Sequence, residues 1–397
     1  MKILWIHEVP YLEKPVYEYQ DFPERLAGRG YEVEVIDFNE ASRTSAGSSQ
    51  VSRTGEGSVT LTRIAHGNMP GYKFIEARIR FRKMLVDRLR RGNIDVVFVY
   101  SVFINGTQAV RLGRKFGVPV VYRVLDAYHR LRPGLAIQTI LRLGERFIYR
   151  HADKVLVTNE EMSSYASRIA GSDISSRTVV VDHGVDSVHF APRPPDAALR
   201  ELYGLSDQDT IALFLGTTYS FSGLVSLVRR MPVALEEMPS LKLLIVGGGD
   251  QDMELASLVE ELELQGRVVL TGMVSYQDVP RYLSLAVLAL NPFEINSITK
   301  DIIPIKILQY QAAGLPVLST PLPDLVRKHS SLSGVEYSVS DDPDTFMSKM
   351  MEMLIDPTQL GVIGKRGQAF VNEKFSVEHA VDCIEATFKH VRNGADR

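Results

Sequence analysis

The chain has 397 residues, of which 45% are hydrophobic and 23% charged, a composition typical of globular proteins and a length that suits two or three domains. A single cysteine, Cys383, excludes an internal disulfide framework and a cysteine-built metal site. The net charge of -3 hides an asymmetry, because residues 1–190 carry 27 lysines and arginines against 21 acidic residues, whereas residues 191–397 carry 18 against 27.

No targeting or membrane-spanning segment is recognisable. The first apolar run, residues 3–6, is interrupted by His7 too early for a signal peptide. The sequence also lacks lipidation motifs and any uninterrupted apolar run of about 18 residues. We therefore expect a cytoplasmic protein that at most lies peripherally on the cytoplasmic face of a membrane.

Short β-branched segments alternate with longer helical patterns, which is typical of parallel α/β sheets. A segment rich in Ser, Gly and Thr, residues 41–57, is predicted to be a loop. The predicted strands of the first half are 2–7, 32–37, 95–100, 118–124, 154–158 and 178–181. Those of the second half are 211–215, 241–246, 268–270, 287–290 and 316–319.

This pattern predicts two Rossmann-like, doubly wound domains that face a central cleft. The first covers residues 1–189 and the second residues 190–375, with a proline-rich hinge at 190–196. A C-terminal helix, residues 376–397, is expected to pack back on the first domain. Ligands of such sheets bind at the carboxyl ends of the strands.

A glycine turn follows the predicted strand at 241–246. Gly247, Gly248 and Gly249 let a phosphate or ribose approach the backbone, and the predicted helix 252–264 offers its N-terminus to an anion. A strand-to-helix turn without a ligand is an equal alternative. The spacing matches neither the dinucleotide fingerprint nor the P-loop, which disfavours NAD enzymes and P-loop kinases.

Pro304 opens a predicted helix on which Lys306, Gln309 and Ala313 share one face. A lysine in the first turn opposes the helix dipole, and a bound anion would remove that conflict. We therefore predict that Lys306 contacts a phosphate, the alternative being a solvated lysine.

Several segments together resemble GT-B-fold glycosyltransferases of the retaining family 4, also called glycosyltransferase group 1. Residues 304–317 resemble the family's donor-site pattern PxKxxEYMAxGxPVV. Residues 152–158 and 181–190 resemble ADxVxxxS and PNGVDxxxF, and residues 241–283 resemble IVGxGP followed by RVxFxGxVxxxxVxxYL. The resemblance covers nearly the whole chain.

This resemblance implies transfer of a sugar from a nucleotide sugar, either UDP- or GDP-linked, with retention of anomeric configuration and no required cofactor or metal. The C-terminal domain would bind the donor, and the N-terminal domain would bind a lipid-linked or polysaccharide glycan acceptor. Two alternatives of the same architecture stay open. One is a catalytically silent GT-B subunit that recruits a partner glycosyltransferase, and the other is a UDP-sugar 2-epimerase.

The family motif also assigns residues to the donor. Asp301 and Gln309 align with two family glutamates, for the donor sugar and the ribose respectively. The family's basic pair for the diphosphate aligns with Thr217 and Ser222, which carry no charge. Lys306, Lys300, the Gly247–Gly249 turn and the helix start at Gly223 would have to supply the compensating charge or donors. The other implied donor contacts are Gly216, Gly247, Gly248, Gly249, Gly272, Met273 and Val274.

For the acceptor, residues 122–129 resemble the YxVRDxWP stretch of family members that act on lipid-linked sugars. Asp126 would position the acceptor hydroxyl, and His129 is a second candidate. Asp341, Asp342 and Asp344 are predicted to cap and begin a helix rather than to bind a metal.

Residues 65–150 hold 17 lysines and arginines against 5 acidic residues. Within 72–91 an apolar helical stripe is interrupted by Arg78 and Arg88. Two interpretations follow: a solvated helix with snorkelling arginines, or a surface that docks on anionic lipid. Nucleic acid is disfavoured as the partner, because no recognisable nucleic-acid module is present.

Overall fold

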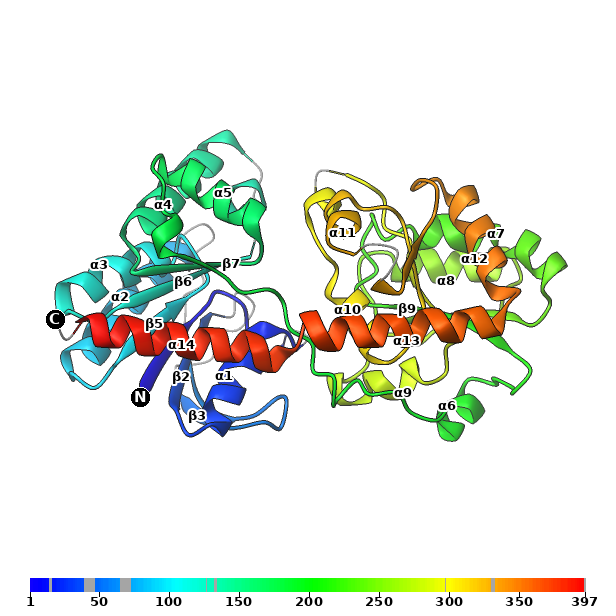
Figure 1. Cartoon of the computed structure of the whole chain (residues 1–397), viewed down its shortest axis with the longest axis horizontal. Helices are drawn as coiled ribbons and strands as arrows, with labels where there is room; N and C mark the ends of the chain where they lie inside the picture. The colour runs from blue at the N-terminus through cyan, green and yellow to red at the C-terminus, as the bar shows by residue number, and fades with distance from the viewer. Residues whose placement is uncertain are drawn as a thin grey trace. The chain divides into compact units, whose positions relative to one another are not determined.

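The computed structural model describes residues 1–13, 16–38, 47–64, 73–125, 127–131, 134–296, 298–329 and 333–395. The chain divides into two compact units (Figure 1). Unit 1 comprises Met1–His183 and Glu378–Arg397, and unit 2 comprises Gly184–Val377. Both units are parallel α/β domains, as the alternation of strand and helix patterns predicts.

Unit 1 contains an eight-stranded sheet in the order β3-β4-β2-β1-β5-β6-β7-β8, parallel except for the β3–β4 pair. β1 and β5, at its centre, are buried on both faces, which explains their continuous apolar sequences. The strand bounds are β1 (Lys2–Ile6), β2 (Glu32–Phe38), β3 (Ser48–Val51), β4 (Val59–Ile64), β5 (Val96–Val99), β6 (Val120–Val124), β7 (Lys154–Val157) and β8 (Thr178–Val180).

Helices cover both faces of this sheet. On one face, α2 (Lys73–Arg90), α3 (Gly106–Phe116), α4 (Leu135–His151) and α5 (Glu160–Ala170) share a core with the strands. On the other face lie α1 (Glu18–Gly28) and α14 (Val377–Ala395), and Phe388 of α14 packs against Phe98 of β5. Arg29 of α1 forms ion pairs with Glu378, Asp382 and Glu385 of α14. Figure 1 shows α14 running across the sheet of unit 1.

The predicted loop at 41–57 is wrong for residues 48–51 and confirmed for residues 52–57. Ser48–Val51 forms β3, which pairs antiparallel with β4, and residues 41–46 lie outside the described residues. β3 carries three exposed polar residues in succession, so its own sequence holds no strand pattern. It is a strand because β4 supplies a hydrogen-bonding edge. β4 itself and β14 were not predicted, whereas each of the eleven predicted strands is present.

Unit 2 contains a six-stranded, fully parallel sheet in the order β11-β10-β9-β12-β13-β14. The strand order reverses between β9 and β12, and parallel α/β sheets bind ligands at the carboxyl edge of such a switch point. The strand bounds are β9 (Thr210–Leu215), β10 (Leu241–Val246), β11 (Val268–Leu270), β12 (Leu288–Asn291), β13 (Val317–Ser319) and β14 (Val335–Tyr337).

The helices of unit 2 pack on both faces of this sheet. Their bounds are α6 (Ala197–Leu202), α7 (Leu224–Glu237), α8 (Asp252–Glu261), α9 (Val279–Leu283), α10 (Ile305–Ala312), α11 (Pro323–Lys328), α12 (Pro343–Leu354) and α13 (Pro357–Lys374). The predicted role of Asp342 is confirmed, because its side chain accepts hydrogen bonds from the backbone of Asp344 and Thr345 and caps α12. Among the described residues, no helix combines the length and apolarity needed to cross a bilayer.

A buried ion pair ties α1 to the sheet of unit 1. Arg123 of β6 is fully buried and donates to both carboxylate oxygens of Glu18, each at 3.0 Å. Its remaining nitrogen donates to the backbone oxygens of Val157 and Val181. Burial alone would raise the pKa of the Glu18 carboxyl, but Arg123 and His183 outweigh burial and lower that pKa to about 2.

We expect Arg123→Met to lower the free energy of unfolding of unit 1 by about 3–5 kcal/mol, because it leaves the Glu18 carboxylate buried without its partner. Trp5, the single tryptophan, lies in β1, so its fluorescence during urea unfolding reports on unit 1. The double variant Arg123→Met/Glu18→Leu is expected to recover most of the loss. A double variant as unstable as the single one would show that lost packing, not the uncompensated charge, is the cause. Arg91→Met, which breaks an exposed pair with Asp87 in the same unit, is the control.

Candidate functional site

Three of the predicted glycines meet at the carboxyl edge of the unit 2 sheet. Gly216, Gly247 and Gly272 follow β9, β10 and β11. The Gly247 N–H donates to the Gly272 oxygen at 3.1 Å, and the Gly216 N–H donates to the Val246 oxygen at 2.8 Å. A Cβ on Gly247 would lie 2.1 Å from the Gly216 oxygen, so a side chain there is sterically excluded.

The loop after β9 and the glycine turn after β10 are locked together. The Gly249 N–H and the Thr218 hydroxyl both donate to Oδ1 of Asp252, at 2.8 and 2.6 Å. Ser222 is fully buried, and its hydroxyl donates to Gln251 at 3.0 Å. Thr217 lies against Gly249, where an added Cβ would come within 2.7 Å of the threonine methyl. The structure thus brings Thr217 to the turn, while Ser222 holds the loop in place.

Lys306 lies against the loop that follows β9, and its side-chain nitrogen, Nζ, has no hydrogen-bond partner among the residues that the structure describes. The side chain is 7% exposed. Nζ lies 3.6 Å from the ring centroid of Phe214 and 4.3 Å from that of Phe293, a cation–π arrangement on both sides. Burial lowers the pKa of the Lys306 ammonium well below its usual range. An anion that reached Nζ would restore the charged form.

Tyr310 holds α10, and therefore Lys306, at the switch point. Its hydroxyl accepts from the Leu215 N–H at 2.7 Å and donates to the Leu290 oxygen at 3.3 Å. These bonds connect α10 to the ends of β9 and β12, the two strands between which the order reverses. A Cβ on Gly216 would lie 3.2 Å from Nζ of Lys306, so the ammonium group lies against the start of the glycine loop.

The remaining predicted donor residues lie in the loops and helix around this point. Gln309 is half-buried on α10, and Asp301 ends the short 3-10 helix Thr299–Asp301, where its side chain is outside the described part. Met273 is 62% exposed just after Gly272, and Val274 packs partly against the core. Gly248 lies beside the Asp252 carboxylate.

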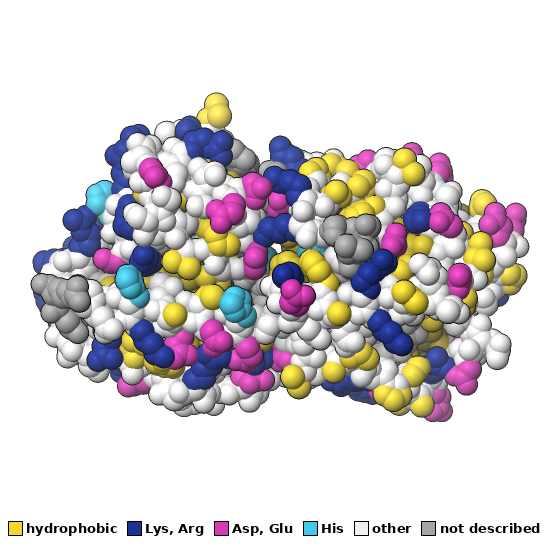
Figure 2. Space-filling view, in the orientation of Figure 1, with side chains coloured by type: hydrophobic (Ala, Val, Ile, Leu, Met, Phe, Trp, Pro, Cys, Tyr) yellow, Lys and Arg dark blue, Asp and Glu magenta, His cyan; other side chains and the backbone are white. Residues whose placement is uncertain are grey.

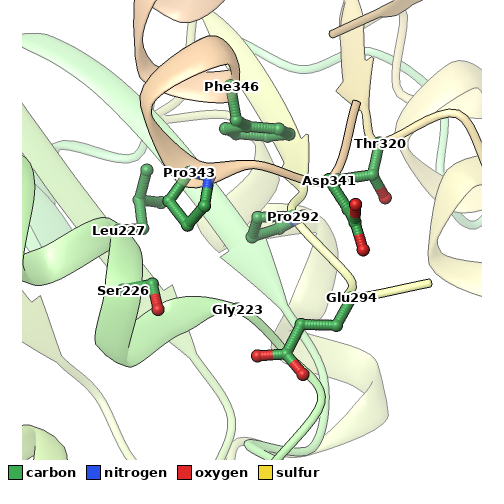
Figure 3. A pocket seen from close by; sticks show the side chains of 9 residues that line it. All are labelled: Gly223, Ser226, Leu227, Pro292, Glu294, Thr320, Asp341, Pro343 and Phe346. Atoms are coloured by element: carbon green, nitrogen blue, oxygen red, sulfur yellow. The ribbon is translucent and has the colours of Figure 1, made fainter. Parts of the chain in front are cut away.

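A small pocket at the same edge of unit 2 is shown in Figure 3. It is lined by Gly223, Ser226 and Leu227 before and within α7, by residues that follow β12 and β13, and by the start of α12. Its cavity volume of about 20 Å³ holds about one water molecule. It is therefore too small to hold a nucleotide.

In unit 1, His129 follows the carboxyl end of β6 and is held from two helices. Its Nδ1 lies 2.7 Å from Oε2 of Glu145, which is fully buried on α4, and 3.1 Å from the hydroxyl of Tyr165 on α5. The preceding Tyr128 donates its hydroxyl proton to Glu8 at 2.7 Å. Two carboxylates thus anchor consecutive residues. Asp126, the other predicted acceptor residue, lies outside the described residues.

The contact with Glu145 selects one tautomer of the neutral His129 imidazole. A carboxylate against Nδ1 favours the tautomer that carries its proton there, which leaves Nε2 as a hydrogen-bond acceptor. In that form His129 suits a hydroxyl group better than an anion. The sequence analysis missed Glu145, although it is the one acidic residue within 127–152, a stretch that is otherwise basic.

Phe214, Phe293, Tyr310 and Asp252 were also missed. Phe214 lies two residues before Gly216, a spacing that in a strand places both residues on one face. That periodicity was the available signal. No pattern in the neighbouring sequence predicts that Phe293 contacts Lys306 or that Tyr310 fixes the helix that carries Lys306.

Two family models match the chain. The model described as "Glycosyl transferase 4-like domain" matches residues 20–184, and the model described as "Glycosyl transferases group 1" matches residues 209–356. Each match falls largely within one of the two units.

Solved structures resemble the whole chain. Sucrose-phosphate synthase from Thermosynechococcus elongatus has a TM-score of 0.79 at 18% identity and covers 99% of both chains. Anabaena HepE in complex with UDP has a TM-score of 0.70 at 17% identity, covering 98% of this chain and all of that one. Such identities show the fold, which is GT-B with two Rossmann-like domains.

The curated relatives match this chain over only part of their length. The chain is 21% identical over 263 residues to an alpha-monoglucosyldiacylglycerol synthase of Streptococcus pneumoniae, covering 64% of this chain and 58% of that protein. It is 25% identical over 251 residues to a D-inositol 3-phosphate glycosyltransferase of Kineococcus radiotolerans, covering 56% and 54%. The matches thus span less than two thirds of these relatives. From the two family models and the shared fold, the chain belongs to the group 1, family 4-type glycosyltransferases.

Proposed function

We propose that the chain transfers a sugar from a UDP- or GDP-sugar to a glycan hydroxyl, with retention of anomeric configuration. The observation that carries this proposal is the buried Lys306 ammonium without a hydrogen-bond partner in the described part of the chain. A departing nucleotide diphosphate needs compensating charge. Lys306 meets that need at the switch point, where Thr217 and Ser222 supply none.

Unit 2 would bind the donor. Lys306 would contact the diphosphate, with the backbone of Gly216 and of Gly247–Gly249 beside it. Gln309 would face the ribose, Asp301 the sugar, and the backbone of Gly272, Met273 and Val274 the base. UDP is bound by the structurally similar Anabaena HepE, which supports a nucleotide diphosphate as the ligand class.

Unit 1 would bind the acceptor, with Asp126 and His129 orienting its hydroxyl. In the reaction, the bond from the acceptor oxygen to the anomeric carbon forms as the bond from that carbon to the phosphate oxygen breaks. The departing phosphate takes the hydroxyl proton, so His129 is needed only to orient that hydroxyl. A glycolipid or lipid-linked glycan is the proposed acceptor, as the name of the pneumococcal relative suggests.

The proposal places the protein peripherally on the cytoplasmic face of a membrane, with α2 near the lipid. Arg78 and Arg88, which interrupt the apolar stripe of α2, are both engaged within unit 1. Arg78 donates to the Phe103 oxygen, and Arg88 pairs with Glu34. The exposed cations that α2 would offer to an anionic surface include Arg82, Lys83 and Arg90.

The second candidate is a silent GT-B subunit, favoured by the uncharged Thr217 and Ser222. A thermal-shift panel of UDP, GDP, ADP and their sugars separates the two. At a hundredfold excess over its Kd, a bound nucleotide stabilises the protein by about 2.7 kcal/mol. We expect such stabilisation by UDP or GDP compounds, followed by acceptor-dependent release of nucleotide. Absence of any nucleotide binding would overturn the proposal, and a donor altered without acceptor would identify an epimerase.

Lys306→Met is expected to weaken UDP or GDP binding by about 10- to 100-fold, the value of a hydrogen bond to a charged group. Binding of the corresponding nucleoside, which lacks phosphate, should be unchanged. The empty variant should be more stable than wild type, because a buried unpaired ammonium has been removed. Lys365→Met, which alters an exposed lysine on α13 of the same unit, is the matched control. Equal loss of nucleoside and nucleotide binding would show that Lys306 only supports the fold.

Glu145→Gln is expected to reduce acceptor turnover by about tenfold, since a hydrogen bond to a charged group is lost. Donor binding should be unaffected. The ring ¹⁵N shifts of His129 report the tautomer directly: Nδ1 should carry the proton in wild type and share it with Nε2 in the variant. Tyr165→Phe, which keeps the carboxylate, is the milder control. An unchanged tautomer with lowered stability would make Glu145 purely structural.

A further inference from the structure

The first three turns of α4 expose aliphatic side chains to solvent. At 100° per residue, Leu141, Glu145 and Ile148 point to the core of unit 1, and all three are buried. Four other aliphatic residues of the helix are strongly exposed; Leu135, Ile140 and Leu143 project away from the core-facing side, whereas Ile137 lies beside that side in the first turn. Their exposed fractions are 83% for Leu135, 52% for Ile137, 54% for Ile140 and 60% for Leu143. A surface helix is normally polar on its outward face, so this side lacks its expected environment.

Basic residues flank the exposed aliphatic side chains. Arg142, Arg146 and Arg150 are spaced four residues apart, lie along one edge of the apolar face and are exposed. Glu145 is the only acidic residue of α4, and it faces the core. The outward side of the helix thus combines aliphatic side chains with an uncompensated positive charge.

The exposed end of α4 lies at the carboxyl edge of the sheet. α4 begins six residues after His129, which follows β6, and α2 begins at the same edge because β4 runs parallel to β2. The first half of α2 also exposes Ile75 and Ile79, at 48% and 52%. Figure 2 shows lysine and arginine side chains along the outer margin of unit 1, on the side of α3 and α4.

We propose that the outward face of α4 docks on an anionic lipid surface. Leu135, Ile140 and Leu143 enter the headgroup region, and the flanking arginines contact lipid phosphates. This docking surface would present a lipid-linked acceptor beside His129. Its role in acceptor binding rests on the proposed function.

Two features favour lipid over a protein partner. The exposed side chains stand out from a convex helix rather than line a groove. They are all aliphatic, whereas protein interfaces concentrate their energy in Trp, Tyr and Arg anchors. Aliphatic side chains beside arginines are the composition that suits an anionic bilayer surface.

The test is flotation of the full chain with phosphatidylcholine vesicles, with and without phosphatidylglycerol, in the absence of nucleotide. Wild type should float with the anionic vesicles. Ile140→Ser/Leu143→Ser should lower the partition constant by about tenfold or more, since each change removes most of a buried aliphatic side chain. Arg142→Gln should lower it by about fivefold. The control is Leu202→Ser/Ile355→Ser, which alters aliphatic residues 68% and 77% exposed in unit 2.

Thermal unfolding should be unchanged in the α4 variant, because these side chains do not pack in the core. Wild type that ignores anionic vesicles, or an α4 variant that floats like wild type, would overturn the inference. So would a wild-type dimer that the α4 variant converts to monomer, since that result assigns the face to a second copy. Vesicle binding without nucleotide binding would sink the proposed function and leave the docking surface standing.

Discussion

A buried ammonium group without a counter-charge is among the most costly arrangements in a protein, and the carboxyl edge of unit 2 is built around one. Lys306 is held between Phe214 and Phe293, whose rings offset only part of the desolvation. The glycines after β9 and β10 let the backbone approach it closely, since a Cβ on Gly216 would lie 3.2 Å from Nζ. Tyr310 fixes the helix from which it projects. These features together support the proposed contact between Lys306 and an anionic ligand.

In unit 1, by contrast, Arg123 and Glu145 are buried charged residues that have hydrogen-bond partners. Arg123 donates hydrogen bonds to Glu18 and to two backbone oxygens, and Glu145 accepts hydrogen bonds from His129 and Tyr165. Each of these pairs joins separate elements and makes them rigid. These buried charged groups of unit 1 have hydrogen-bond partners, whereas Lys306 of unit 2 has none in the described part of the chain. This difference fits the proposal that unit 1 orients a neutral hydroxyl and unit 2 binds a diphosphate.

Much of the fold was predictable because central parallel strands are buried on both faces and read as apolar runs. β3 was not, since its polar residues owe their conformation to the β4 edge. In the site, the glycines and Lys306 were predictable from local geometry. Their partners were not: Phe293 and Tyr310 reach the lysine through the folding of the sheet, and no sequence period encodes that. Arg78 and Arg88 appeared unmatched on α2 because Phe103 and Glu34, which engage them, are 25 and 54 residues away.

The central claim is that a bound nucleotide diphosphate pairs with Lys306 and stabilises its charged form. Calorimetric titration with UDP or GDP, in buffers of different ionisation enthalpy, counts the protons exchanged on binding. Because burial depresses the pKa of the lysine in the free protein and a bound anion raises it, wild type should take up protons on binding at a pH between these two pKa values. In Lys306→Met the uptake should vanish and binding should weaken. Equal proton exchange and equal affinity in both proteins would contradict the account.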